Sequence, residues 1–189
     1  MGHSVAAAHP LSLNLLKDKW YAAQVKASCE KAVAVMLRSH GYDEFVPLRK
    51  WRRRWSDRTK EDEVPVFPGY VFFRIQRPVI TRVVTVPNVI RIVGFGKEPV
   101  SIPESEINAI RCAVESGKLV TPAAFLQRGQ LARVVSGSLT GVEGLFVERR
   151  GQNRLILSIT LLQRSVAVEI DKHDVEPVSK SLYVAGRSR

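Results

Sequence analysis

The chain has 189 residues, and its 29 Lys and Arg outnumber its 18 Asp and Glu to give a net charge of +11. This length accommodates one large domain or two small ones, and the 45% of apolar residues are enough for packed cores. No run approaches the roughly 18 consecutive apolar residues that cross a bilayer, so we expect no membrane partner. The positive charge instead favours a polyanionic partner, most often nucleic acid.

The two cysteines, Cys29 and Cys112, lie far apart in the sequence. Their spacing predicts neither a zinc site nor a disulfide framework, and it favours a reducing compartment. Residues 1–17 lack a basic leader before an apolar run, so we expect a flexible N-terminus in place of a signal peptide. The predicted location is therefore the cytoplasm.

The first ordered segments are expected to be a strand and an amphipathic helix. Residues 20–25, Trp-Tyr-Ala-Ala-Gln-Val, are typical of a strand. Ser28 offers a helix N-cap, and Gly41 supplies the C-terminal stop. Between them one apolar stripe recurs at helical spacing: Cys29, Val33, Met36 and Leu37. Residues 45–48 predict a second strand, at a sheet edge because Pro47 cannot donate a ladder hydrogen bond.

Seven basic residues and two tryptophans lie between residues 49 and 60, directly before an acidic run at 61–63. In one interpretation this segment is a loop that grips phosphates, with Trp51 or Trp55 stacking on exposed bases. In the other it is a solvated hairpin tip whose acidic flank neutralises part of its charge. The candidate nucleic-acid-binding residues are Arg49, Lys50, Trp51, Arg52, Arg53, Arg54, Trp55, Arg58 and Lys60.

The segment Val66–Phe73 is the centre of the N-terminal half. Its turn, Pro68-Gly69, fixes where a strand begins. Beyond the turn, the side chains at 70 and 72 point to one face and those at 71 and 73 to the other, and all four are aromatic or branched. The strand is therefore either covered on both sides within the protein or has one face left for a partner protein.

The rest of the N-terminal half repeats the same kinds of element. A short helix is expected from Pro78 to Val84, and residues 89–93 predict a further strand. A second long helix follows Ile102-Pro103 and stops at Gly117. Its apolar stripe consists of Ile107, Ile110 and Val114. The βαββαβ order predicts an α+β fold: a ferredoxin-like antiparallel α/β sandwich with its helices on one face of the sheet.

Residues 129–178 differ in character, because they contain β-branched runs, spaced glycines and no helical stripe. This pattern predicts a small SH3-like β-barrel. Its strands are expected near 131–135, 142–149, 154–160 and 165–170, with residues 150–153 closing a hairpin. The predicted organisation is a flexible N-terminus over 1–17, a first domain over 18–118, a linker over 119–127, the barrel over 128–179 and a flexible tail over 180–189.

Taken together, these segments resemble the NusG-type transcription elongation factors. The first domain is similar to their N-terminal (NGN) domain through motifs in the family's order: Trp20-Tyr21, Glu30-Lys31, Gly41-Tyr42, Phe45-Val46-Pro47, Phe67-Pro68-Gly69-Tyr70, Val86-Pro87-Asn88-Val89, Val93-Gly94-Phe95-Gly96 and Ile102-Pro103. The second is similar to their KOW domain through Gly129, Val134, Gly137, Gly141 and Gly144 and the strand at 164–170. The resemblance covers residues 19 to 178.

The resemblance implies a monomeric, non-enzymatic regulator, without cofactor or metal, that binds the clamp helices of the largest RNA polymerase subunit. Position by position, it places these residues at the polymerase: Gln24, Phe67, Tyr70, Phe72, Thr81 and Arg82. The first four would form the docking patch, although some relatives have an aromatic residue at position 24. The last two would lie near a helix that in some relatives reaches the other large subunit. Bridging the cleft would favour the closed clamp and suppress pausing, and DNA or nascent RNA could be contacted as well.

The predicted barrel departs from the housekeeping pattern of this family at one position. Where the common strand has Phe-Gly-Arg, this chain has Leu162-Gln163-Arg164, and the candidate partner-binding residues are Leu161, Leu162 and Arg164. The missing aromatic predicts weakened binding to a small-subunit ribosomal protein or to Rho, and it resembles specialised paralogues. A plain packing exchange of Phe for Leu is the alternative.

Several functions stay open at this point. The resemblance favours a processive antiterminator or antipausing factor for particular operons. The alternatives are a general housekeeping elongation and termination factor, and a ribosome-associated or free RNA-binding module. We do not expect an enzyme, because the four histidines show no ligand spacing and no nucleophile or phosphate-loop motif is present.

Overall fold

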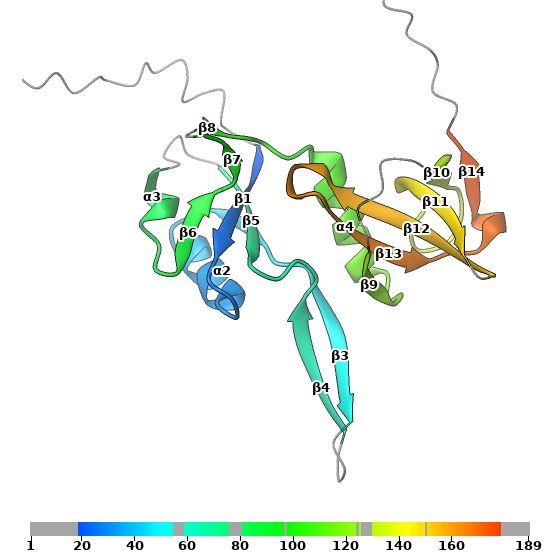
Figure 1. Ribbon diagram of the computed structural model, residues 1–189, viewed down its shortest axis with the longest axis horizontal. Helices are drawn as coiled ribbons and strands as arrows, with labels where there is room; N and C mark the ends of the chain where they lie inside the picture. Colours follow the sequence, from blue (N-terminus) through cyan, green and yellow to red (C-terminus); the bar gives the residue numbers. More distant parts are fainter. Residues whose placement is uncertain are drawn as a thin grey trace, which may run out of the picture.

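The computed structural model describes residues 19–54, 59–75, 81–96, 98–123, 125, 130–149 and 151–178. Figure 1 shows an N-terminal sheet with helices, a C-terminal barrel, and helix α4 (Glu104–Glu115) between them. Within the described residues no helix is long and apolar enough to cross a membrane. The α+β class, an antiparallel α/β sandwich followed by a β-barrel, is confirmed. The expected flexible termini, 1–17 and 180–189, lie outside the described residues.

The N-terminal sheet has four antiparallel strands in the order β2-β5-β1-β6. These are β1 (Trp20–Val25), β2 (Asp43–Phe45), β5 (Tyr70–Arg74) and β6 (Val89–Ile92). Strand β5 is central because it pairs with β1 on one side and with β2 on the other. The expected strand over 45–48 is wrong in its bounds, since β2 ends at Phe45 and Pro47, which has no N–H, lies between β2 and the next strand.

The two faces of this sheet carry separate cores. One contains Tyr21, Val71 and Phe73 and packs against α2 (Glu30–Ser39) and α3 (Thr81–Val84). The other contains Phe72 and packs against α4. The expectation that the helices lie on one face is therefore wrong. Both faces of β5 are apolar, so each needs its own cover.

The helix ends follow local backbone signals. Gly41, after α2, and Gly117, after α4, have φ values of +79° and +73°, the left-handed conformation that glycine adopts without strain. The start of α2 differs from expectation: Cys29 is the N-cap, and Ser28, with φ of +64°, lies in the turn before it.

The basic segment is neither an open loop nor part of the main sheet. Strands β3 (Leu48–Arg54) and β4 (Thr59–Pro65) form a two-stranded hairpin that extends away from both domains (Figure 1). A smaller hairpin, β7 (Gly94–Phe95) with β8 (Glu98–Pro99), follows β6. A Cβ at position 94 would lie 2.0 Å from the carbonyl oxygen of residue 98, so only glycine fits there.

The C-terminal sheet has six antiparallel strands in the order β14-β10-β11-β12-β13-β9. The strands are β9 (Val120–Ala123), β10 (Gln130–Val134), β11 (Glu143–Arg149), β12 (Gln152–Ile159), β13 (Arg164–Glu169) and β14 (Val175–Pro177). The four expected strands correspond to β10 through β13. Strand β9 lies within the segment 119–127 that we expected to be a linker, and it pairs with β13. The chain therefore joins the barrel sheet within a few residues of the end of α4.

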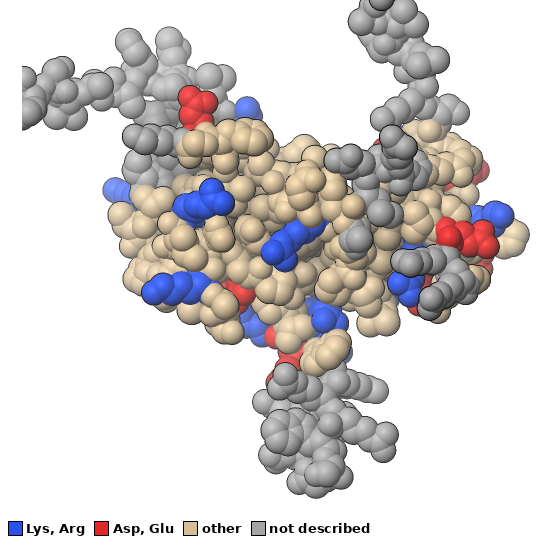
Figure 2. Space-filling view, in the orientation of Figure 1, with Lys and Arg blue, Asp and Glu red and all other residues tan. Residues whose placement is uncertain are grey.

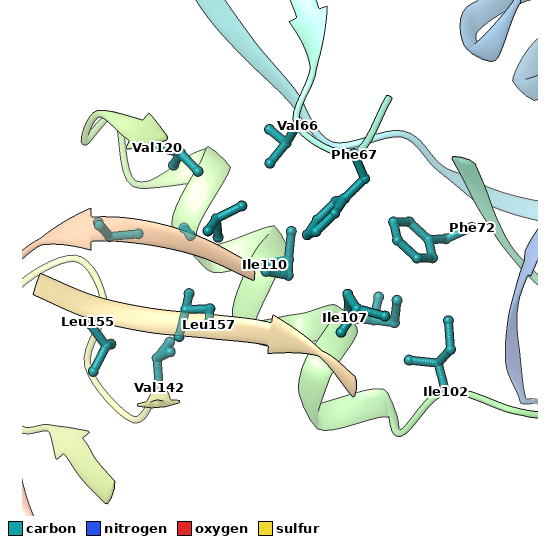
Figure 3. Packing of buried hydrophobic residues seen from close by; sticks show 14 of the residues in the cluster. Val66, Phe67, Phe72, Ile102, Ile107, Ile110, Val120, Val142, Leu155 and Leu157 are labelled. Atoms are coloured by element: carbon teal, nitrogen blue, oxygen red, sulfur yellow. The ribbon is translucent and has the colours of Figure 1, made fainter. Parts of the chain in front are cut away.

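One apolar core runs from the N-terminal sheet through α4 into the barrel (Figure 3). Phe67 and Phe72 lie on the sheet side, Ile107 and Ile110 project from α4, and Leu157 lies on β12. All five side chains are at most 2% exposed. The two units are therefore packed together, and α4 contributes to both.

Candidate functional site

The turn before β5 is held by a buried carboxylate. Gly69 has a φ of +82°, and its N–H donates to Oε1 of Glu30, the first residue of α2, at 2.7 Å. Its carbonyl accepts the N–H of Val25 at 2.9 Å. Glu30 is only 3% exposed, so this hydrogen bond is shielded from water. The two contacts fix the turn, and with it the positions of Phe67 and Tyr70.

Aromatic side chains line the sheet face beyond this turn. The Phe67 ring meets the Phe72 ring edge to face at 5.7 Å, and the Phe45 and Phe72 rings lie 6.2 Å apart. Phe67 is 2% exposed and Phe72 is fully buried, whereas Tyr70 is partly exposed. We call these residues, Phe45, Phe67, Tyr70 and Phe72, the aromatic face. Phe67 and Phe72 serve the fold, and Tyr70 is the member at the surface.

The barrel covers this face. The Arg164 guanidinium, at the start of β13, lies 5.3 Å from the centre of the Tyr70 ring. Beside it, the N–H of Thr160 donates to Oε2 of Glu106 on α4 at 3.0 Å. Leu161 and Leu162 are half-buried and pack against the shared core. The predicted partner-binding residues of the barrel and the predicted polymerase-binding residues of the sheet therefore face each other.

Gln24 lies at the edge of the aromatic face. It is opposite Tyr70 in the pairing of β1 with β5. On its other side, Nε of Arg91 in β6 donates to its Oε1 at 2.8 Å. The Gln24 amide is thus held in place by a cross-strand hydrogen bond. Beside Tyr70, the neighbouring positions on β1 and β6 are therefore polar, Gln24 and Arg91.

Thr81 and Arg82 are not part of this cluster. They belong to α3, whose buried residue Val83 packs in the core on the opposite face of the sheet. On that face burial raises the pKa of Tyr42, and the Arg82 guanidinium partly offsets the rise. These two predicted residues therefore lie on a different surface from Tyr70.

The hairpin register separates its base from its tip. Lys50 lies opposite Glu63, and Trp51 lies opposite Asp62. Further out, Arg53 lies opposite Lys60, with no acidic residue across the ladder. Side chains from 52 to 61 and the residues 55–58 fall outside the described set, so Trp55 and Arg58 have no described position. The acidic run thus lies opposite the base of the hairpin, whereas further out Arg53 and Lys60 are opposite each other.

An aromatic side chain is available at the base of the hairpin. Trp51 is 43% exposed, and the Arg49 guanidinium lies 4.6 Å from its ring centre. Glu63 forms an ion pair with Lys31 of α2 at 3.6 Å. Because alternate residues of a strand point to opposite faces, Arg49 and Trp51 share one face of the hairpin while Lys50 lies on the other. This stacked pair resembles the base-stacking surfaces of single-strand binding proteins in its chemistry.

Elsewhere the basic side chains are dispersed. Figure 2 shows the described Lys and Arg of one face of the molecule as separate groups, with no continuous basic field. No group of three or more His, Cys, Asp or Glu that could hold a metal ion occurs among the described residues. The hairpin, whose register places basic residues opposite each other, is therefore the candidate for contact with nucleic acid.

Two polar residues of α4 were missed by sequence reasoning. Glu106 makes the contact with the barrel, and Arg111 lies over the rings of Trp20 and Phe45. In the sequence both are ordinary polar positions of an amphipathic helix, so no local signal marks them. Glu30, by contrast, belongs to a motif that the resemblance already singled out.

Comparison with known proteins gives consistent results. The family model described as "Transcription termination factor nusG" matches residues 18–111. The chain is 25% identical over 180 residues to the transcription termination/antitermination protein NusG of Helicobacter pylori, covering 84% of this chain and 98% of that protein. It is 27% identical over 180 residues to the protein of the same name from Escherichia coli K12, covering 85% and 96%.

The fold has a counterpart among solved structures. A structure titled "Domain interaction in Thermotoga maritima NusG" matches with a TM-score of 0.50 and 22% sequence identity. The match covers 86% of this chain and 98% of that one. The similarity therefore extends over both the N-terminal sheet and the barrel.

Proposed function

We propose that this chain, as a NusG-type transcription factor, binds RNA polymerase through its aromatic face and modulates elongation. The partner surface is the clamp helices of the largest subunit. The observation that carries the proposal is the cover over Tyr70: this partly exposed aromatic packs at the margin of the shared core and lies under the Arg164 guanidinium of the barrel. Such a contact contributes about 0.5–2 kcal/mol, which a larger protein interface can replace.

Binding through this face requires the barrel to move. The same displacement frees Leu161, Leu162 and Arg164, which lie against the aromatic face or its core. One opening step therefore exposes the polymerase-binding surface and the barrel's own partner-binding edge together. Ligands that bind only the open arrangement shift the population towards it.

The hairpin supplies the proposed contact with nucleic acid. It projects from the N-terminal sheet (Figure 1), and its register leaves Arg53, Arg54 and Lys60 without acidic residues opposite. DNA or nascent RNA near the polymerase carries the complementary charge. We assign phosphate contact to the tip and base stacking to Trp51.

The proposed specialisation rests on the barrel. Leu162 occupies the position of the family's common aromatic and packs against the protein's own core. Weaker binding of Rho or of a ribosomal protein follows, which favours antitermination at particular operons over a housekeeping role. The chain would act in the cytoplasm as a monomer, without catalytic activity.

The test has two parts: whether the chain still binds RNA polymerase after nuclease treatment, and how tightly the wild type and a Tyr70 variant bind the purified polymerase. Tyr70→Ala should raise the dissociation constant for purified RNA polymerase about thirtyfold, equivalent to about 2 kcal/mol. Phe95→Ala is the matched control, because Phe95 is an aromatic residue 77% exposed on β7, away from this face. Equal binding by the wild type and Tyr70→Ala would refute the assigned surface. Binding that disappears with nuclease would instead support a free RNA-binding module.

A further inference from the structure

A polar pocket opens at one end of the aromatic face. Its volume is about 430 Å³, and its lining comes from the N-terminal unit alone: Trp20, Arg38, Tyr42, Asp43, Glu44, Arg74 and Arg111. Asp43, Arg74 and Trp20 lie side by side in the strand register. The pocket is therefore built on the row of the sheet where β1 and β2 begin and β5 ends, and the barrel contributes no residue to its lining.

The acidic residues of the pocket already have basic partners. Arg38 donates to Glu44, and Arg74 contacts Asp43 at 2.5 Å. Arg74 also lies 3.8 Å from Glu104 at the start of α4. The lining thus contains three arginines and two carboxylates, and each of these carboxylates is engaged by an arginine.

The remaining arginine is Arg111. Its guanidinium lies 5.4 Å from the Trp20 ring centre and 5.0 Å from that of Phe45. Within the described residues it has no ion pair and no hydrogen bond. Contacts with ring faces leave the N–H groups of a guanidinium available, since these point outward in its plane. Arg111 therefore presents a positioned donor group to the pocket.

A second donor without a partner among the described residues belongs to a residue of the same lining, Trp20. Trp20 is 3% exposed, and its indole Nε1 is buried without a hydrogen-bond partner among the described residues. Buried polar groups nearly always have such a partner, because losing water without replacement is unfavourable. An indole N–H can only donate, so any group that pairs with it is an acceptor.

We propose that this pocket binds a carboxylate, supplied by an Asp or Glu side chain of the protein that docks on the aromatic face. A planar carboxylate matches a guanidinium in geometry and charge and has a second oxygen for another donor. Phe45 links the pocket to the face, because its ring contacts both Arg111 and Phe72. The source of the carboxylate rests on the proposed function, whereas the pocket's chemistry does not.

The pocket stays open while the barrel covers Tyr70. An acidic side chain can therefore engage Arg111 before the domains separate. The contact would then hold the partner beside the aromatic face during opening. This gives the N-terminal unit a first contact that does not depend on the position of the barrel.

The chemistry is tested with acetate as the probe on the full chain. The ¹H–¹⁵N spectrum contains indole signals from the three tryptophans, and Trp51→Phe and Trp55→Phe identify the third as Trp20. At constant ionic strength, acetate should shift the Trp20 indole signal saturably, and Arg111→Met should weaken that binding at least tenfold. If acetate causes no saturable shift, the pocket is not a carboxylate site, and Arg111 only packs on the rings of Trp20 and Phe45. Tenfold tighter binding of inorganic phosphate than of acetate would overturn the assignment to a carboxylate.

The source is tested with purified RNA polymerase. Arg111→Met should weaken polymerase binding about tenfold, and Lys172→Met, an exposed position in the barrel, should not. If Arg111→Met binds polymerase as tightly as the wild type does, and the wild type binds acetate, the carboxylate does not come from polymerase. If the wild type binds acetate but no polymerase, the proposed function fails together with the source, and the carboxylate pocket stands.

Discussion

The carboxylate of Glu30 is expected to stabilise the turn that positions the aromatic face. It accepts the N–H of Gly69 at 2.7 Å from a side chain that is 3% exposed. A hydrogen bond from an N–H to a charged group contributes about 1.5–3 kcal/mol, and an acidic residue in the first turn of a helix adds about 0.3–1 kcal/mol. Glu30→Ala should therefore lower the free energy of unfolding by about 2–4 kcal/mol.

Urea unfolding of the full chain, followed by tryptophan fluorescence, measures this change. Trp20 is buried in the core beside β5 and reports on the N-terminal unit. Glu30→Gln keeps an oxygen acceptor and should recover part of the loss. Glu115→Ala removes an exposed acid from α4 and should change stability by less than about 0.5 kcal/mol. A loss below about 1 kcal/mol in Glu30→Ala would refute the role of this hydrogen bond.

Two further predictions concern the hairpin and the contact between the domains. Replacing Arg53, Arg54 and Lys60 by Ala should reduce the slope of log affinity against log salt by about 2–3, since each phosphate contact contributes about 0.7–0.9. Lys50→Ala, opposite Glu63 at the base, is the control, and an unchanged slope in the triple variant would mean that the tip is merely solvated. Glu106→Ala removes the acceptor of the Thr160 N–H and should tighten polymerase binding severalfold, because it weakens the closed arrangement. Glu115→Ala on the same helix serves as its control, and weaker binding by Glu106→Ala would show that the barrel does not compete with polymerase.

Much of the fold could be predicted because its signals are local. Short runs of aromatic and branched residues identified β1, β5 and β6, and the glycines after α2 and α4 marked where those helices end. The errors also have local causes. Pro47 is expected in an edge strand but lies between two strands. For the basic segment the sequence leaves a loop and a hairpin tip open, and the structure shows a hairpin, β3 paired with β4. Strand β9 was missed because four residues containing Pro122 carry little pattern of their own.

The candidate site was predictable only in part. The resemblance singled out Phe67, Tyr70 and Phe72, and the structure gathers them on one face. It could not indicate that Arg164 lies over Tyr70. Nor could it indicate that α3 places Arg82 on the opposite side of the sheet. These relationships depend on how elements far apart in the sequence pack.

The sequence by itself determined which surfaces are apolar, where the chain turns and which segments form strands, because these follow from the side-chain period and from backbone preferences. Only the tertiary structure decided what covers each surface. The aromatic strand was expected to have either an internal cover or a partner protein, and the structure supplies an internal cover from α4 and from Arg164 of the barrel. Periodicity shows that a face must be buried, but many apolar surfaces would satisfy that need. The choice among them is made by long-range packing, which also leaves Arg111 and Trp20 with donors that no described residue satisfies.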